Sequence, residues 1–169
     1  GSTVHVEWRN TVSKNGALLQ PDISASFISD TQIKVVSDKA GDVVSITVNG
    51  KEYTVTLDSS KTATITLDQA YTGNLDVKVT HTNTVVGITT KYDTTVTVSN
   101  LDFTTIADVN GKWSLPVTGL PSISDQPSDA HIHVSSQDQA GNISSSIDRT
   151  VPITRTESAT INVIAGDDI

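Results

Sequence analysis

The chain has 169 residues, a formal net charge of −8 at pH 7 and an aromatic content of only 4 %. Few aromatic rings and a surplus of acidic side chains offer little for stacking bases or attracting phosphates, so the composition argues against nucleic-acid binding. No stretch has the roughly 18 consecutive apolar residues of a membrane span, and the absence of cysteine excludes disulfides and thiolate metal sites.

Short stretches of alternating apolar and polar residues follow one another along the chain, which is typical of half-buried β-strands. None sustains the spacing of an amphipathic helix over roughly eleven residues, so we expect an all-β protein. The predicted strands cover residues 4–8, 23–28, 32–36, 43–48, 53–57, 63–67, 75–81, 88–98, 131–134 and 149–153.

Three Asn-Gly dipeptides punctuate these strands: Asn15-Gly16, Asn49-Gly50 and Asn110-Gly111. Both residue types accept the positive φ of tight hairpin turns, so each dipeptide predicts a tight turn. Asn49-Gly50 is the clearest, because alternating strands flank it on both sides.

The number and spacing of the strands fit two β-sandwiches. Residues 21–100 supply enough strands to close one sandwich alone, whereas residues 101–157 supply only the second half of another. Two arrangements remain open. In one, the complete sandwich is inserted into the other through a loop; in the other, two sandwiches follow in series as residues 1–100 and 101–169.

Three motifs of the second half resemble the bacterial immunoglobulin-like repeats of giant, type I-secreted (RTX/BapA-like) surface adhesins. They are Asn110-Gly111-Lys112-Trp113-Ser114, Asp138-Gln139-Ala140-Gly141-Asn142 and Ile161-Asn162-Val163-Ile164-Ala165-Gly166-Asp167-Asp168. The resemblance implies immunoglobulin-like sandwiches, an extracellular place on the bacterial cell surface, a part in cell adhesion and biofilm formation, and neighbouring modules of the same chain as partners.

In the family order, the strand that precedes Trp113 resembles Thr3–Trp8, which lies far upstream. We therefore expect a split domain: residues 1–20 plus 101–157 form the outer module, residues 21–100 form the inserted module, and residues 158–169 form the linker and first strand of a following module. Trp8 and Trp113 are then expected to lie close together. Ala159–Ile164 is expected to fill a vacant sheet edge, in the same chain or by exchange with a neighbour.

The resemblance also implies calcium at the junctions between neighbouring modules. Its ligands would be Asp138, Asn142, Asp167 and Asp168, with Asp108 as a further candidate; clustered carboxylates suit this hard cation. The alternative is that these are solvated turn residues, for which aspartate is a common choice. His131 and His133 stand two apart on a predicted strand, so they face one side and suggest a zinc site with His5, or simply a polar row.

No motif of nucleophilic, phosphate-binding or metallohydrolase chemistry is present, so we expect no enzyme. The leading hypothesis is an extender that projects an adhesive tip. The alternative is a module that binds a peptide or glycan, on a host or another surface, through the inserted sandwich. Its available contact aromatics are Tyr53, Tyr71, Tyr92 and Phe103.

Overall fold

The computed structural model describes residues 1–118, 120, 128–144, 146–153 and 161–164. All regular elements in these residues are β-strands, which confirms the all-β prediction. None of these residues forms a helix long and apolar enough to cross a membrane. The strands are β1 (Thr3–Lys14), β2 (Ile23–Phe27), β3 (Gln32–Ser37), β4 (Val43–Val48), β5 (Lys51–Thr56), β6 (Thr62–Thr66), β7 (Gly73–Val85), β8 (Ile88–Ile106), β9 (Ser114–Val117), β10 (Ser128–Gln137), β11 (Ile147–Ile153) and β12 (Ile161–Ile164).

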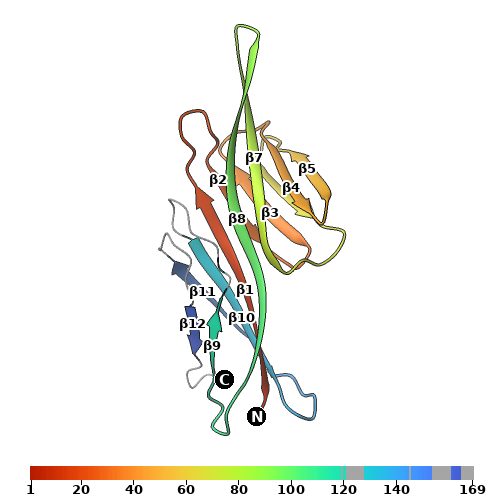
Figure 1. The fold of residues 1–169 in the computed structure, drawn as a ribbon, viewed down its shortest axis with the longest axis vertical. Coiled ribbons are helices and arrows are strands. Elements are labelled where there is room, and N and C mark those ends of the chain that lie inside the picture. Colours follow the sequence, from red (N-terminus) through yellow and green to blue (C-terminus); the bar gives the residue numbers. More distant parts are fainter. Residues whose placement is uncertain (119, 121–127, 145, 154–160, 165–169) are drawn as a thin grey trace.

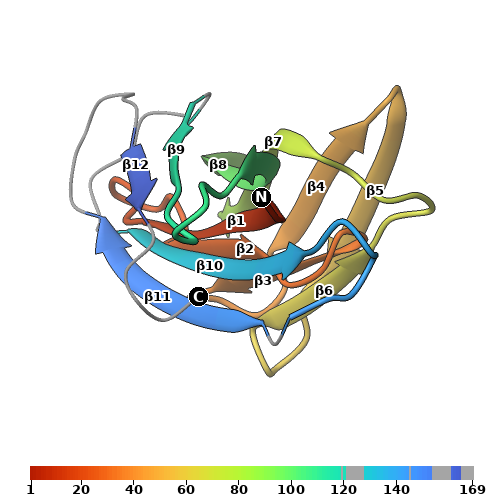
Figure 2. The ribbon, with the colours of Figure 1, turned by 90° about the horizontal axis from the view of Figure 1, so that it is seen from below.

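Ten strands form one sheet, in the order β5-β4-β7-β8-β1-β2-β3-β6, with β10 paired to β1 and β11 to β10. β9 and β12 form a separate two-stranded sheet. All pairings are antiparallel. The large sheet curves back on itself, so the fold is a β-sandwich that approaches a barrel (Figure 2).

The alternating strands bury their apolar faces in two separate hydrophobic clusters. The distal core, far from the N-terminus in Figure 1, comprises Val12, Ile23, Ala25, Phe27, Ile33, Val35, Val44, Ile46, Leu57, Ile65, Leu67, Leu75, Val77, Val79, Val96 and Val98. The proximal core comprises Val4, Val6, Trp8, Ala107, Trp113, Leu115, Val117, Leu120, Ala130 and Val134. Trp8 and Trp113 therefore share one core, as expected.

Two strands pass through both cores. β1 places Trp8 in the proximal core and Val12 in the distal core. β8 has 19 residues, a length of about 60 Å at the usual strand rise, and Figure 1 shows it running along most of the molecule. It places Val98 in the distal core and packs Phe103 against the proximal one.

The sequence predicted that this strand ends at Val98, which is wrong. Ser99 and Asn100 resemble linker residues, yet both are buried and hydrogen-bonded, and β8 continues through them to Ile106. Because their polar groups are satisfied inside the protein, they cost little when buried. The strand can therefore connect the two cores without a break.

The Asn-Gly predictions have different outcomes. Asn49 and Gly50 take φ values of 50° and 81° between β4 and β5, which confirms the tight turn. At Asn110-Gly111 only the glycine has positive φ, inside a turn from Asp108 to Lys112. The tight turn at Asn15-Gly16 is wrong: Gly16 has no positive φ, its amide donates to Asp22 Oδ1, and the chain instead turns at Ala17–Gln20 with Leu19 at φ 68°.

The C-terminal strand β12 pairs with β9 of the same chain, in the register Ile161↔Val117 to Ile164↔Ser114. This agrees with the expectation that Ala159–Ile164 fills a sheet edge in the same chain. Ala159 and Thr160 lie outside the described residues.

Candidate functional site

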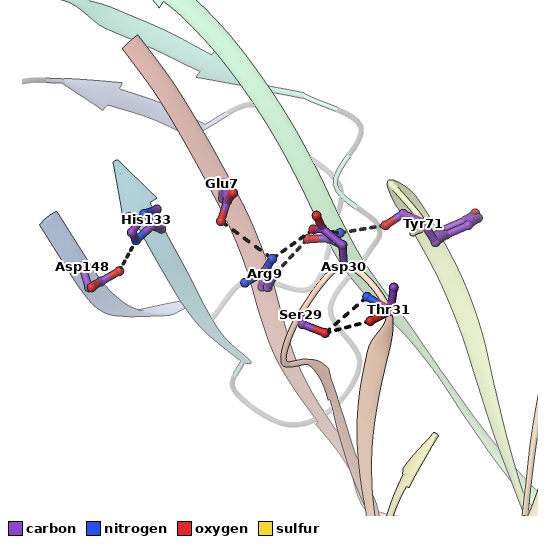
Figure 3. A network of polar contacts seen from close by, with 9 residues as sticks. Glu7, Arg9, Ser29, Asp30, Thr31, Tyr71, His133 and Asp148 are labelled. Atoms are coloured by element: carbon purple, nitrogen blue, oxygen red, sulfur yellow. Dashed lines mark hydrogen bonds and ion pairs between the residues drawn. The ribbon is translucent and has the colours of Figure 1, made fainter. Parts of the chain in front are cut away.

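A network of polar groups lies where the two cores meet (Figure 3). Arg9 of β1 donates from Nε to Asn100 Oδ1 and from Nη2 to Asp30 Oδ1, each at 3.0 Å. Asn100 of β8 donates from Nδ2 to Asp30 Oδ1 at 3.1 Å and to the carbonyl oxygen of Tyr71 at 2.7 Å. We call these four residues the joint. They connect the two strands that cross between the cores to the β2–β3 turn and the β6–β7 loop.

The contacts within the joint favour the charged form of the Asp30 carboxylate. The hydrogen bond from Asn100 and the charge of Arg9 lower the pKa of Asp30, against the opposing effect of burial. The Arg9 side chain is only 21 % exposed, and Glu7 Oε2 lies 3.7 Å from its Nη2 atom. A planar guanidinium with several fixed acceptors holds its neighbours in one geometry. The joint therefore holds β1 and β8 in a fixed arrangement with the β2–β3 turn and the β6–β7 loop.

Asp138, a predicted calcium ligand, uses its carboxylate inside its own turn. Its Oδ1 accepts the backbone N–H groups of Ala140 and Asn142 at 2.9 and 2.8 Å, and its Oδ2 accepts from Asn142 Nδ2 at 3.0 Å. These hydrogen bonds, that of the Asn142 side chain first, lower the pKa of Asp138. Gly141 closes the turn at φ 89°. The structure thus brings Asp138 and Asn142 into direct contact within one turn.

Asp108 builds the same kind of turn, since its Oδ1 accepts the N–H groups of Asn110 and Lys112. Within the described residues, no group of three or more acidic or histidine side chains is placed to hold a metal ion. Asp167 and Asp168 lie outside those residues. Asp108 and Asp138 therefore accept hydrogen bonds within their own turns, and the described residues of the predicted set do not by themselves complete a calcium shell.

The two histidines of β10 face one side, as the two-residue spacing predicted, and each has a hydrogen-bond partner. His131 Nε2 lies 2.8 Å from Thr11 Oγ1, and His133 Nδ1 lies 2.5 Å from Asp148 Oδ1. His5 is paired with Ser135 rather than with either histidine. A shallow groove of about 390 Å³ runs along this face, lined by Glu7, Arg9, His131, Ile132, His133, Asp148, Arg149 and Thr150.

A buried acid in the distal half was not predicted from the sequence. Asp42 is only 1 % exposed; its Oδ2 accepts from Ser37 Oγ at 2.8 Å and its Oδ1 lies 2.6 Å from His81 Nδ1. The acid stands between the serine and the histidine, so the histidine does not contact the serine hydroxyl and cannot activate it as in a serine hydrolase. This arrangement is a structural anchor at the base of the β7–β8 hairpin.

Two contact aromatics of the binding hypothesis border surface hollows. Tyr53 accepts the N–H of Asp68 at its hydroxyl, and Lys51 lies over its ring. Tyr71 stacks on Phe27 with ring centroids 6.2 Å apart. It borders a hollow of about 550 Å³ lined also by Ser45, Thr47, Glu52, Asn74, Leu75, Asp76, Lys78 and Thr97. By contrast, Phe103 packs against the proximal core.

Comparisons of the chain with protein-family models, with curated proteins and with solved structures found no match.

Proposed function

We propose that this chain is a non-catalytic extender module of a bacterial surface adhesin, placed outside the cell between immunoglobulin-like modules of the same protein. The observation that carries the proposal is the passage of β1 and β8 through both cores. Continuous strands transmit force and orientation between two packed units, whereas a loop linker leaves them free to move. The joint adds four hydrogen bonds at the same place.

The proposal includes the split arrangement of two immunoglobulin-like sandwiches. The proposed outer module is residues 1–20 plus 101–157, and the proposed inserted module is residues 21–100. β1 of the outer module contributes Trp8 to the proximal core and continues into the distal core with Val12. Three observations support it: the cores are separate, both tryptophans lie in the proximal core, and residues 3–8 pair with residues 101–106. Residues 158–169, as the linker and first strand of a following module, complete it.

Calcium is the second part of this proposal. Asp138, Asn142 and Asp108 would hold the ion together with Asp167 and Asp168, and the cation would offset the repulsion of their carboxylates. The acidic turns supply oxygen ligands of the right kind at Asp138 and Asn142. Because the described residues do not assemble the shell alone, the carboxylates of Asp167 and Asp168 are required.

Thermal unfolding in millimolar calcium and in excess chelator tests the proposal, with tryptophan emission as the readout because both tryptophans report the proximal core. We expect calcium to raise the melting temperature, and Asp138→Ala or Asp167→Ala to abolish that rise. Asp58→Ala is the matched control, since Asp58 makes the same kind of turn contact, with the N–H of Ser60, in the distal half. Equal melting temperatures with and without calcium would remove calcium from the proposal.

A second candidate function is binding of a glycan or peptide by the inserted sandwich. The hollow beside Tyr71 favours it, because hydroxyl, carboxylate and ammonium groups converge there in the mixture that orients a polar ligand. Chemical-shift changes at Thr47, Asp76 and Thr97 on titration with neutral oligosaccharides would support this function. Unchanged shifts across a broad panel of oligosaccharides and peptides would contradict it.

A further inference from the structure

The hairpin formed by β7 and β8 continues beyond the rest of the protein. β4 pairs with β7 only as far as Thr80, whereas the β7–β8 register runs on to Val85↔Ile88. In the part of the chain that the structure describes, residues 82–91 therefore pair only with each other. We call them the ribbon. Figure 1 shows the ribbon projecting at the end of the molecule opposite the N-terminus.

The ribbon ends in a turn that is strained for its sequence. Val86 and Gly87 have φ values of 50° and 74°, nearly those of Asn49 and Gly50 at 50° and 81°. Asparagine tolerates this left-handed conformation, whereas the branched side chain of valine clashes in it. At the Asn49-Gly50 turn, the residue type thus matches the left-handed backbone conformation. At residue 86 an apolar side chain occupies the tip in spite of the strain.

Apolar side chains are concentrated at this tip and are uncovered. Val85 is 58 % exposed, Val86 94 % and Ile88 70 %. Val85 and Ile88 are directly paired, so their side chains lie on one face of the ribbon. The ribbon is also held in shape, by contacts between Thr84 Oγ1 and Thr89 Oγ1 at 3.1 Å and between His81 and the buried Asp42 at its base.

The edges of the ribbon lack the groups that normally keep an edge strand from pairing. Proteins block such edges with charges, proline or bulges. β5 has Lys51 and Glu52, and β11 has Arg149 and Pro152. The ribbon has threonine, valine and isoleucine, no proline, no acid, and only Lys91 as a charge.

We propose that the ribbon is a self-association site, at which the ribbon of a second copy of this chain adds to its edge about a two-fold axis. An antiparallel strand edge is complementary to itself under a two-fold rotation, so the same residues serve both copies. The backbone groups of the edge would then be paired, and Val85, Val86 and Ile88 would lose solvent exposure against the ribbon of the other copy.

The charge distribution favours a second copy of the chain as the partner of the ribbon. The chain carries a net charge of −8, which opposes contact between copies over most of the surface. Residues 82–91 contain no acid, so this repulsion is weakest at the ribbon. A ribbon that lacks tyrosine and tryptophan and has a single lysine is also poorly suited to a lipid surface.

Sedimentation velocity of the whole chain from micromolar to submillimolar concentration tests the proposal. We expect a monomer–dimer equilibrium in which Ile88→Lys raises the dissociation constant by about tenfold or more. Val86→Asn should also weaken the dimer while keeping the turn, as Asn49 shows, so its melting temperature should not fall. Val109→Asn is the matched control, because Val109 is 97 % exposed but lies in the Asp108 turn, and it should leave the dimer unchanged.

Disulfide cross-linking tests whether the contact between the two copies lies at the ribbon. The chain has no cysteine, so a single introduced thiol is unambiguous. Thr84→Cys or Thr89→Cys, one on each ribbon strand, should give a disulfide-linked dimer on oxidation, and Val109→Cys should not. A chain that stays monomeric at all concentrations would overturn the proposal. So would a dimer that Ile88→Lys leaves intact, or a ribbon that associates only with a different protein.

Discussion

Asp42 is the most deeply buried acid of the described residues, at 1 % exposure, and it has two partners. Removing one member of a buried polar group leaves the others unsatisfied, which costs more than the bond itself contributes. Asp42 also lies where the loop before β4 meets β7. A single side chain thus connects the distal core to the base of the ribbon.

Asp42→Ala is therefore expected to lower the free energy of unfolding by about 2–3 kcal/mol. Urea denaturation measures this loss. The matched control is Asp76→Ala, which removes one exposed hydrogen bond to Thr97 and should cost about 0.5 kcal/mol or less. Equal losses in the two variants would show that the Asp42 contacts do not stabilise the fold.

At the scale of the elements, the alternating pattern predicted most strands correctly, because most of them bury one face. The pattern did not predict strand residues that are both polar and buried. The predicted strand ended before Ser99 and Asn100, because both are polar. Their place in β8 depends on Asn74, Asp30 and the Tyr71 carbonyl, which are 25 to 70 residues away in sequence. The joint could not be predicted for the same reason: no local pattern shows which distant groups will satisfy a buried amide.

Among the candidate site residues, too, local features could be predicted and contacts between distant segments could not. The turns of Asp108 and Asp138 depend on neighbouring residues, and the sequence indicated both. Whether they approach Asp167 and Asp168 depends on how distant segments pack, which no spacing reveals. The tight turn expected at Asn15-Gly16 failed because the Asp22 side chain captures the Gly16 amide and supports a wider loop.

The joint makes a pH-dependent contribution to stability. The pKa of Asp30 is lowered in the folded protein, chiefly by the hydrogen bond from Asn100. Its contribution is present in full above the ordinary aspartate pKa of about 3.9 and is lost as the pH falls through the lowered folded value. Asp30→Asn should remove this acid-range dependence, and at pH 7 it should cost about 1 kcal/mol or less, because the Asp30 carboxylate is half exposed. Urea denaturation across the acid range measures both effects.

At the scale of the whole molecule, β1 and β8 make the two cores parts of one body. Bending at the boundary would break the β1–β8 ladder between Arg9 and Asn100 together with the hydrogen bonds of the joint. The protein is therefore expected to be stiff, and it is elongated, with its ribbon far from its N-terminus (Figure 1). Stiffness is the property that an extender needs, and it would also hold the ribbon in a fixed direction for a second copy.

Residual dipolar couplings of the backbone amides test this stiffness most directly, because they report the orientation of each core independently. We expect the couplings of both cores to fit a single alignment tensor. Suitable reporters are Ile33, Val44 and Val77 in the distal core and Val6, Leu115 and Val134 in the proximal core. Two tensors of different magnitude or orientation would show that the cores move independently, and would contradict the proposal of a rigid extender.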